Sequence, residues 1–470
     1  MRRFNKNKYL RKLKLKRYWQ NNLRYFYISI PCLLCLVLGI YFAYSKFFVS
    51  SEEEVVRTTV GEFIYGDIIM TPYVDGEYSS TFPEKKTGIN VEKVICDGDV
   101  SASWDEDKWG LYVTNLSKRT KCSVYFVTPN SCGINDNVSC INSREGLATL
   151  ANEVNNGDNK SGKIIYLTSD IDLGGKFDGD GNALDGNISW TPIGTDSNPF
   201  SGTFDGNGHI ISNMYVSSND VTGLFNFVFL GEIKNIGIES SYVLTLDNIA
   251  AGIVGQLKNG EIENCYNSAN VNGAGAGGIV NFTDNSNIKN CYNTGTINGN
   301  SKQFTGGIVD YFGNSNHQSI IRNVYNTGDI SCKINAAGIA GGLQGIIENS
   351  YNFGIINGDS CSGGIAGQMF TYTYPTIKNS YNVGQSTGGG ISGCPYQTYE
   401  YKLDGNYYLE GTAGYGFCYF KSNQGAEPLS QEEMPSVISV INGDNAFVED
   451  TNNINNGYPI LKWQAERENN

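Results

Sequence analysis

The chain has 470 residues, of which 17% are charged and 57 are glycine, and its net charge is −13. So few charged residues exclude a coiled coil or a helical array, which would be rich in Ala, Glu, Lys and Leu. The many aromatic residues exclude a charge-driven disordered chain. A composition rich in glycine and tyrosine favours β-structure with many tight turns.

The N-terminus divides into a basic tail and an apolar segment. Residues 1–24 carry ten basic residues and no acidic one, so the rest of the chain carries a net charge of −23. Residues 25–44 carry no charge, and a bilayer core requires about 20 apolar residues. We predict a cytoplasmic tail at 1–24, a transmembrane signal-anchor helix at 25–48 and an exported remainder. A cleaved signal peptide is the alternative.

Short alternating runs separated by turn clusters follow the apolar segment and predict a small antiparallel β module at 51–128. Trp104 and Trp109 are expected to pack in its core. Residues 129–160 are interpreted as a linker with one short helix, which Ser143 caps. The alternating runs are Glu62–Met70, Val91–Cys96, Trp109–Asn115 and Cys122–Val127.

Ten of the 12 cysteines lie outside the predicted membrane span, and an even number in an exported chain suggests disulfides. These ten form no Cys-x-x-Cys pair and the chain has only 2 histidines, so a zinc site is not expected. The pairs that the spacing favours are Cys96–Cys122 and Cys132–Cys140, with Cys332–Cys361 and Cys394–Cys418 as weaker pairings.

Two short motifs recur in phase through the second half of the chain. Each repeat holds short strands and no helix-length run, so one unit cannot bury its own apolar face. Stacking the units as coils of a parallel β-solenoid at 161–420 buries that face. The copies are Asn264–Asn267, Asn290–Asn293, Asn323–Asn326, Asn349–Asn352 and Asn379–Asn382 for Asn-x-Tyr-Asn, and Gly252–Val254, Gly278–Val280, Gly307–Val309, Gly338–Ala340 and Gly364–Ala366 for Gly-Ile-Val/Ala.

In such a solenoid, equivalent residues of successive coils stack about 4.8 Å apart. An Ile stands four residues before each motif Tyr, and strand alternation predicts that Ile, Asn and Tyr share one face. The residue after each Ile then lies on the other face, where mostly alternating charges favour register. The isoleucines are Ile262, Ile288, Ile321, Ile347 and Ile377, and the charged residues are Lys234, Glu263, Lys289, Arg322, Glu348 and Lys378.

Cys265 and Cys291 occupy one column of consecutive coils. Their expected separation is at the limit of an unstrained bridge, so the interpretation favours a free pair over a disulfide. After the coils, Ser430–Glu433 has the pattern of a capping box that opens a short helix. We expect residues 421–470 to form a C-terminal cap over the end of the solenoid.

Several segments resemble bacterial cell-surface proteins with GLUG-type repeats. The opening segment is Ile164–Leu173, followed by Trp190–Gly194 and Pro199–Ile211. Gly223-Leu224-Phe225 is similar to the repeat signature, and Asn456–Trp463 is similar to the end of many such chains.

This resemblance implies an all-β protein with a right-handed parallel β-helix on the bacterial cell surface. It implies little about the ligand, because one fold hosts many functions. Some members of the broad group are zinc-dependent immunoglobulin A peptidases. The His-Glu-x-x-His motif of those enzymes is absent, since His209 and His317 are the only histidines.

Polysaccharide-cleaving enzymes with parallel β-helices are the principal alternative. Their chemistry requires convergent carboxylates, or calcium with a basic residue. Acids are sparse in the coils, where Asp284, Asp310 and Asp329 are expected in turns or at strand ends and form no repeated pair. We therefore predict no catalytic residues and no enzyme activity.

Two sets of residues are candidates for binding. The first has calcium-loop character but lacks Gly at the sixth and Glu at the twelfth position, so an ordinary polar loop stays open as an alternative. The second is a ladder of tyrosines that fits either sugar stacking or the wall of the solenoid. The calcium candidates are Asp178, Asp180, Asn182 and Asp185, and the ladder is Tyr266, Tyr292, Tyr325, Tyr351 and Tyr381.

The sequence as a whole predicts a protein of the bacterial cell membrane whose bulk is extracellular and which acts as a surface adhesin or interaction scaffold. Glycans or surface proteins of a host or of bacteria are the expected partners. The acidic exported part argues against nucleic acid, which requires a basic face. A purely structural envelope protein is the remaining alternative.

Overall fold

The computed structural model describes strands within residues 55–127 and the residues 137–300, 304–313, 319–370, 374–395, 401–442 and 445–468. The chain forms two compact units, residues 1–130 and 131–470, which are described separately. The predicted membrane segment at 25–48 lies outside the described residues. Among those that are described, no helix combines the length and apolar character that crossing a bilayer requires.

The first unit is antiparallel, as its alternating runs predict. The register sets Cys96 opposite Cys122, although their side chains and those of Trp104 and Trp109 lie outside the described part. Its strands are β1 (Val55–Phe63), β2 (Ile68–Met70), β3 (Tyr73–Val74), β4 (Glu77–Tyr78), β5 (Asn90–Cys96), β6 (Ser101–Asp105), β7 (Gly110–Thr114) and β8 (Thr120–Val127).

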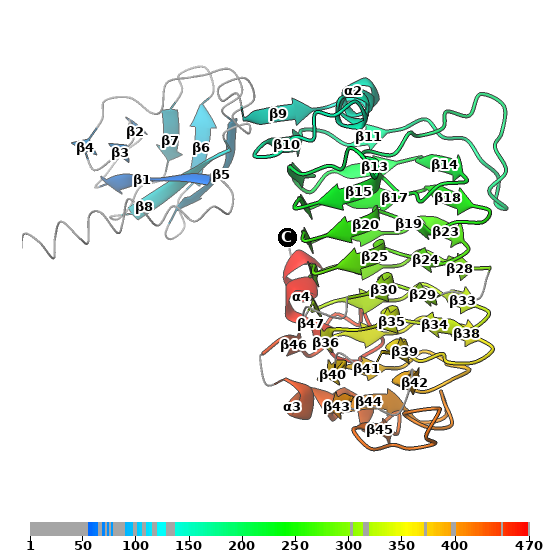
Figure 1. Cartoon of the computed structure of the whole chain (residues 1–470). Helices are drawn as coiled ribbons and strands as arrows, with labels where there is room; N and C mark the ends of the chain where they lie inside the picture. Colours follow the sequence, from blue (N-terminus) through cyan, green and yellow to red (C-terminus); the bar gives the residue numbers. More distant parts are fainter. Residues whose placement is uncertain are drawn as a thin grey trace, which may run out of the picture. The chain divides into compact units, whose positions relative to one another are not determined.

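The second unit is a parallel β-solenoid, which confirms the predicted coils (Figure 1). Two ten-stranded sheets run along the solenoid, and they are called the first and the second sheet below. The first contains β9 (Val138–Ile141), β10 (Ile164–Leu167), β12 (Thr203–Asp205), β16 (Glu232–Lys234), β21 (Glu261–Glu263), β26 (Asn287–Lys289), β31 (Ile320–Arg322), β36 (Ile346–Glu348), β40 (Thr376–Lys378) and β43 (Lys402–Asp404). The second contains β11 (Ile171–Asp172), β13 (Ile210–Ser212), β17 (Gly237–Glu239), β22 (Tyr266–Asn267), β27 (Tyr292–Asn293), β32 (Tyr325–Asn326), β37 (Tyr351–Asn352), β41 (Tyr381–Asn382), β44 (Asn406–Leu409) and β45 (Ala426–Leu429).

Three further sheets complete the coils, so a full coil passes through the first, second, third, fifth and fourth sheets in that order. The third contains β14 (Tyr215–Ser218), β18 (Tyr242–Thr245), β23 (Asn270–Gly273), β28 (Ile297–Gly299), β33 (Ile330–Cys332) and β38 (Ile356–Gly358). The fourth contains β15 (Phe225–Phe229), β20 (Val254–Lys258), β25 (Val280–Asp284), β30 (Val309–Phe312), β35 (Ala340–Leu343), β39 (Ala366–Met369) and β42 (Ser392–Pro395). The fifth contains β19 (Ala250–Ala251), β24 (Ala276–Gly277), β29 (Phe304–Gly306) and β34 (Asn335–Ala337).

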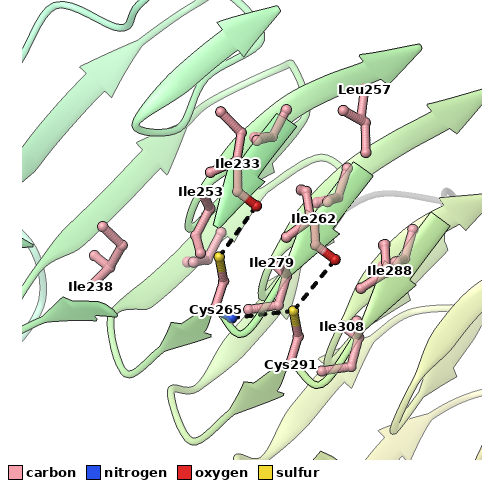
Figure 2. Close-up of a cluster of buried hydrophobic side chains, with 14 of the residues drawn as sticks. Ile233, Ile238, Ile253, Leu257, Ile262, Cys265, Ile279, Ile288, Cys291 and Ile308 are labelled. Atoms are coloured by element: carbon pink, nitrogen blue, oxygen red, sulfur yellow. Dashed lines mark hydrogen bonds between the residues drawn. The ribbon is translucent and has the colours of Figure 1, made fainter. Parts of the chain in front are cut away.

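The predicted isoleucine column is confirmed. Ile262 pairs with Ile288, and the column continues in register through the coils to Ile377, each side chain fully buried. Figure 2 shows Ile262 and Ile288 side by side in this core. Burying an Ile contributes roughly 1.5–3 kcal/mol, so the column is a main source of stability.

The prediction that Ile, Asn and Tyr share a face is wrong. Asn264 and its equivalents have a positive φ near 50°, which turns the chain between the first and second sheets. Asn tolerates this left-handed conformation better than most residues. The turn breaks the alternation, so Ile262 points into the core, Asn264 lies exposed at the corner, and the next core side chain is Cys265.

The second Asn of each motif forms a buried ladder inside the solenoid. Asn293 donates through Nδ2 to Gly295 O in its own coil and to Asn326 Oδ1 in the next coil, both at 2.8 Å. The same pattern connects the five members, all fully buried. They are Asn267, Asn293, Asn326, Asn352 and Asn382.

The Gly of the second motif explains why the two motifs stay in phase. A Cβ atom built on Gly307 would lie 2.5 Å from the amide of Asn326, and one built on Gly338 would lie 2.4 Å from that of Asn352. These glycines therefore leave the space that the amide ladder occupies, which is the close approach that glycine permits. In each case the Gly of one motif makes room for the Asn of the other motif, so the two motifs must keep the same spacing.

Asn326→Ala removes the donor to Gly328 O and both links of the ladder at that coil. Leaving buried polar groups without partners is expected to cost about 2–3 kcal/mol of unfolding free energy, measured by denaturant titration. The control is Asn298→Ala in the half-buried pair with Asn272 on the third sheet, with an expected cost under about 1 kcal/mol. Equal costs would contradict the role of the inner ladder.

The N-terminal end of the solenoid begins earlier than predicted. β9 pairs with β10 at the edge of the first sheet, and α2 (Arg144–Asn155) buries Leu147, Leu150 and Val154 in the same core. The predicted helix cap is confirmed, because Ser143 Oγ accepts from Gly146 N at 3.2 Å. The stretch at 129–160, which the sequence predicts as a linker, therefore contains the first strand of the solenoid and a helix whose apolar side chains are buried in its core.

The C-terminal segment lies along the side of the solenoid rather than over its end. It contains η2 (Met434–Val437), α3 (Ile438–Ile441), β46 (Phe447–Val448), β47 (Ile460–Leu461) and α4 (Lys462–Glu468). The capping box is confirmed, since Glu433 N donates to Ser430 Oγ and Ser430 N donates to Glu433 Oε2. Trp463 Nε1 donates to Asn323 O, three coils before the end, so the segment (here the strap, 430–468) turns back along the second sheet.

Candidate functional site

The five motif tyrosines form a continuous ladder of stacked rings. Consecutive centroids lie 4.8–5.1 Å apart with planes within 12° of each other. The strap covers this ladder: Trp463 stacks on Tyr325, and the Arg467 guanidinium lies 4.5 Å from the ring centroid of Tyr292. Tyr351 donates to Gln464 Oε1 at 2.8 Å, and Tyr381 contacts Pro459 O.

This arrangement determines what the ladder can bind. A sugar stacks on an exposed ring face, whereas here the rings stack on neighbouring tyrosines and Trp463 and Arg467 of the strap pack against them. Tyr351 and Tyr381 are 0% exposed, and burial raises the pKa of both hydroxyls. Burial and a hydrogen bond to Glu239 raise the pKa of Tyr266. This geometry favours the wall interpretation of the tyrosines over sugar stacking, and the strap packs against the ladder.

Trp463→Ala removes the stacking on Tyr325 and the hydrogen bond to Asn323 O. Because Trp463 supplies two of the contacts that hold the strap on the ladder, amide hydrogen exchange of residues 445–468 is expected to rise at least about tenfold while the coils keep their protection. Val440→Ala, at an exposed position of α3, serves as the control and should change nothing. Equal loss of protection in the coils would show that the strap does not open separately.

The charged column on the first sheet is confirmed as a set of ion pairs. Lys289 Nζ lies 2.8 Å from Glu263 Oε2, and Lys378 Nζ lies 2.7 Å from Glu348 Oε2. Arg322 approaches the same Glu348 at 3.7 Å. The basic partners keep about a third or more of their side chains exposed, so each pair contributes under about 1 kcal/mol and favours register more than stability.

A polar groove of about 930 Å³ runs beside this column, where each coil turns from the fourth into the first sheet. Strand register places its segments at one position of five successive coils, so the groove extends roughly 19 Å along the solenoid at about 4.8 Å per coil. The segments are Ser161–Ile164, Ser201–Thr203, Leu230–Glu232, Asn259–Glu261 and Asn285–Asn287.

Glycines make the floor of this groove. A Cβ atom built on Gly260 would lie 2.5 Å from Gly231 O, and one built on Gly231 would lie 2.8 Å from Val228 Cγ1. The floor residues Gly202, Gly231 and Gly260 carry no side chain, and the flanking residues form two rims. Ser286 ends the row of glycines, with its hydroxyl donating to Asp284 O at 2.9 Å.

One rim is formed by residues with positive φ, namely Leu230, Asn259 and Asn285. Asn285 Nδ2 donates to Asn259 Oδ1 at 2.6 Å, and both residues line the groove. Leu230 stands where later coils have Asn, and it is 63% exposed beside Phe229, which is 37% exposed. A bulky residue in this backbone conformation is uncommon and indicates a local role for its side chain.

The other rim carries the polar side chains Thr203, Glu232, Glu261 and Asn287 in one column. Glu232 lies 3.4 Å from Lys234 Nζ and accepts from Thr203 Oγ1 at 3.3 Å. Glu261 lies 3.4 Å from Lys289 Nζ. The two carboxylates thus share one wall, whereas glycoside hydrolysis requires carboxyl groups on both sides of the bond. The carboxylates of this rim can accept hydrogen bonds from a ligand, but they do not stand on opposite sides of it as hydrolysis requires.

The calcium candidates do not converge. Asp178 Oδ1 accepts from the backbone N–H groups of Asp180 and Asn182, and hydrogen bonds from Asn182 lower the Asp178 pKa. Tyr242 donates to Asp180 O, so the loop is held by tyrosine contacts, and Asp185 is exposed. No group of three metal-ligating side chains occurs in the part of the chain described here. The loop's present geometry is that of a polar turn, and calcium binding stays an untested expectation.

The cysteines pair differently from the weaker predictions. Cys361 is bonded to Cys394, which corrects Cys332–Cys361 and Cys394–Cys418. The bridge joins the turn before Gly363 to the strand β42 of the following coil, with Cα atoms 5.0 Å apart. Cys140 is disulfide-bonded, and the predicted partner Cys132 lies outside the described residues.

Cys265 and Cys291 are free and fully buried, as the interpretation favours (Figure 2). Cys265 N donates to Cys291 Sγ at 3.4 Å, and burial raises the pKa of the Cys291 thiol. Both thiols therefore act as small core side chains between Ile262 and the second sheet.

Asp310 is a buried carboxyl group that the sequence interpretation places in a turn or at a strand end. It lies inside β30 and is 2% exposed, and its Oδ1 has no hydrogen-bond partner. Burial raises its pKa well above the usual value, and a hydrogen bond from Asn281 opposes this only in part. Its Oδ2 occupies the space beside Gly275, where a built Cβ atom would lie 2.9 Å away.

Asp310→Asn is expected to stabilise the protein at neutral pH. A raised pKa in the folded state means that folding favours the protonated acid, so the contribution of Asp310 to stability is fully present below its unfolded pKa near 3.8 and is lost as pH rises from there towards the folded pKa. The amide of the variant cannot ionise, so the melting temperature of Asp310→Asn should exceed that of the wild type by an amount that grows between pH 4 and pH 8. Asp329→Asn, in a turn, is the control; the same slope in both would contradict burial as the cause.

Comparisons with known proteins add little to this geometry. No protein-family model and no curated protein matches the chain. A solved structure described as "a putative immunoglobulin A1 protease from Bacteroides ovatus" is 23% identical, with a TM-score of 0.44, and the match covers 69% of this chain and 92% of that chain. A similarity of this extent carries no argument about activity, and the relation to GLUG-type surface proteins remains a resemblance.

Proposed function

We propose that the protein is a membrane-anchored surface scaffold that binds ligands along the side of its solenoid. The observation that carries this proposal is the polar groove, which follows one position of five successive coils and holds its two carboxylates on one wall. Such a surface suits an extended ligand and no bond-breaking arrangement. The basic tail and uncharged segment at 1–44 supply the proposed anchor and orientation, with the acidic remainder outside the cell.

The proposed orientation is tested with epitope tags at both ends of the full chain expressed in bacteria. Protease added to intact cells is expected to remove the C-terminal tag while the N-terminal tag survives until lysis, because the basic tail stays inside. The matched control replaces the ten basic residues of 1–24 by Gln, which should reduce this bias. Protection of both tags on intact cells would contradict an exported solenoid.

The enzyme alternative keeps one observation in its favour, which is that Glu232 and Glu261 both line the groove. Incubation of the protein with neutral and acidic polysaccharides separates the two functions. A scaffold releases no new reducing ends and no unsaturated products. Release that is lost in Glu232→Gln or Glu261→Gln would replace the scaffold proposal with an enzyme.

A further inference from the structure

We infer that the groove binds a single strand of an uncharged polysaccharide. This inference rests on the proposed surface-binding function and adds the class of ligand. Three properties of the groove lead to it: the periodicity of its rims, the chemistry of the groups that face it, and the paired state of the strands in its wall.

The periodicity favours a polymer with a regular repeat. The wall column and the positive-φ rim both recur once per coil, about every 4.8 Å. A glycan strand presents the same hydroxyl groups at regular intervals, whereas a peptide presents a different side chain at each position. Glu232 and Glu261, which carry the same side chain in successive coils, can therefore make the same contact with successive units of a glycan.

The exposed groups are those that recognise hydroxyls. Glu232 and Glu261 offer carboxylate oxygens, and Asn259 and Asn287 offer amides, which together accept and donate hydrogen bonds. Carboxylate acceptors form the stronger, charge-assisted bonds to O–H donors. At one end of the row of positive-φ residues, Leu230 and the adjacent Phe229 supply an exposed apolar contact for the C–H face of a sugar ring.

The charge of the groove favours an uncharged polysaccharide over an acidic one. Of the charged side chains that line the groove, Glu232 and Glu261 are negative and Lys163 alone is positive. Lys163 already donates to Asn137 Oδ1 at 3.0 Å, and Lys234 and Lys289 are engaged by the carboxylates. A polyanion would thus meet two carboxylates and no uncommitted cation, which is unfavourable since like charges repel in a partly enclosed site.

The wall excludes the usual way in which an extended peptide binds a sheet. A peptide adds to a sheet through the unpaired edge of a strand. The groove wall consists of β10, β12, β16, β21 and β26, each of which pairs with a strand on both sides. Main-chain hydrogen bonds are therefore not available to a peptide here, which leaves side-chain groups as the recognition surface.

The test is affinity electrophoresis of the full chain in detergent through gels that contain glucomannan, hydroxyethyl cellulose or polygalacturonate. Retardation is expected in at least one neutral gel and not in polygalacturonate. The groove variant carries Asn259→Ala and Glu261→Gln, and its affinity should fall at least about tenfold because one amide is removed and one carboxylate becomes a weaker, neutral acceptor. Asp247→Asn with Asn298→Ala, which make the corresponding acid-to-amide and Asn-to-Ala changes outside the groove, should bind like the wild type.

Several outcomes would overturn the inference. Retardation in polygalacturonate alone would reject the uncharged ligand, and equal binding by the groove variant would reject the groove. If no polysaccharide binds but cells that display the protein adhere to surface proteins, the groove inference fails and the scaffold function stands. If both assays are negative while the variants keep the wild-type melting temperature, the scaffold function fails too.

Discussion

The structure depends on the fit between a buried amide ladder and the glycines that make space for it. Asn293 and its equivalents bond to the coil above, the coil below and a carbonyl of their own coil. An amide placed one residue out of register would face apolar core without partners, which costs roughly 1–3 kcal/mol per group. The ladder therefore specifies register, while the isoleucine column supplies most of the burial energy.

Register then decides what each face of the solenoid offers. The same stacking that aligns Ile262 with Ile288 brings Lys289 to Glu263 and places Glu232 over Glu261. On the second sheet it stacks the tyrosines into a ladder, which the strap occupies. The groove is the polar side of the same repeat, and the glycines at its floor lie between two columns of side chains.

The repeated part of this arrangement could be predicted from sequence, because motif phase determines which residues stack. The isoleucine column, the ion pairs and the free pair Cys265/Cys291 follow from spacing alone. The face of each motif residue could not be predicted by alternation, since the positive φ at Asn264 turns the chain. A column of αL-tolerant Asn at a fixed offset was the signal that could have revealed this corner.

The non-repeated part was beyond prediction for a different reason. Trp463 and Asn323 are separated by 140 positions, and nothing in the strap repeats with the coils. The Cys361–Cys394 bridge likewise joins a turn to a strand of the next coil, so intervals between cysteines did not reveal it. The glycine floor required the stacked coils to be known before a groove could be recognised.

The central claim is that the inner asparagines form one buried, hydrogen-bonded ladder. Hydrogen exchange of side-chain amides, followed by NMR on the intact protein, tests it most directly. The account predicts that the Nδ2 hydrogens of Asn293, Asn326 and Asn352 exchange as slowly as core backbone amides and show nuclear Overhauser contacts from one coil to the next. Exchange as rapid as that of exposed asparagines, without contacts between coils, would contradict it.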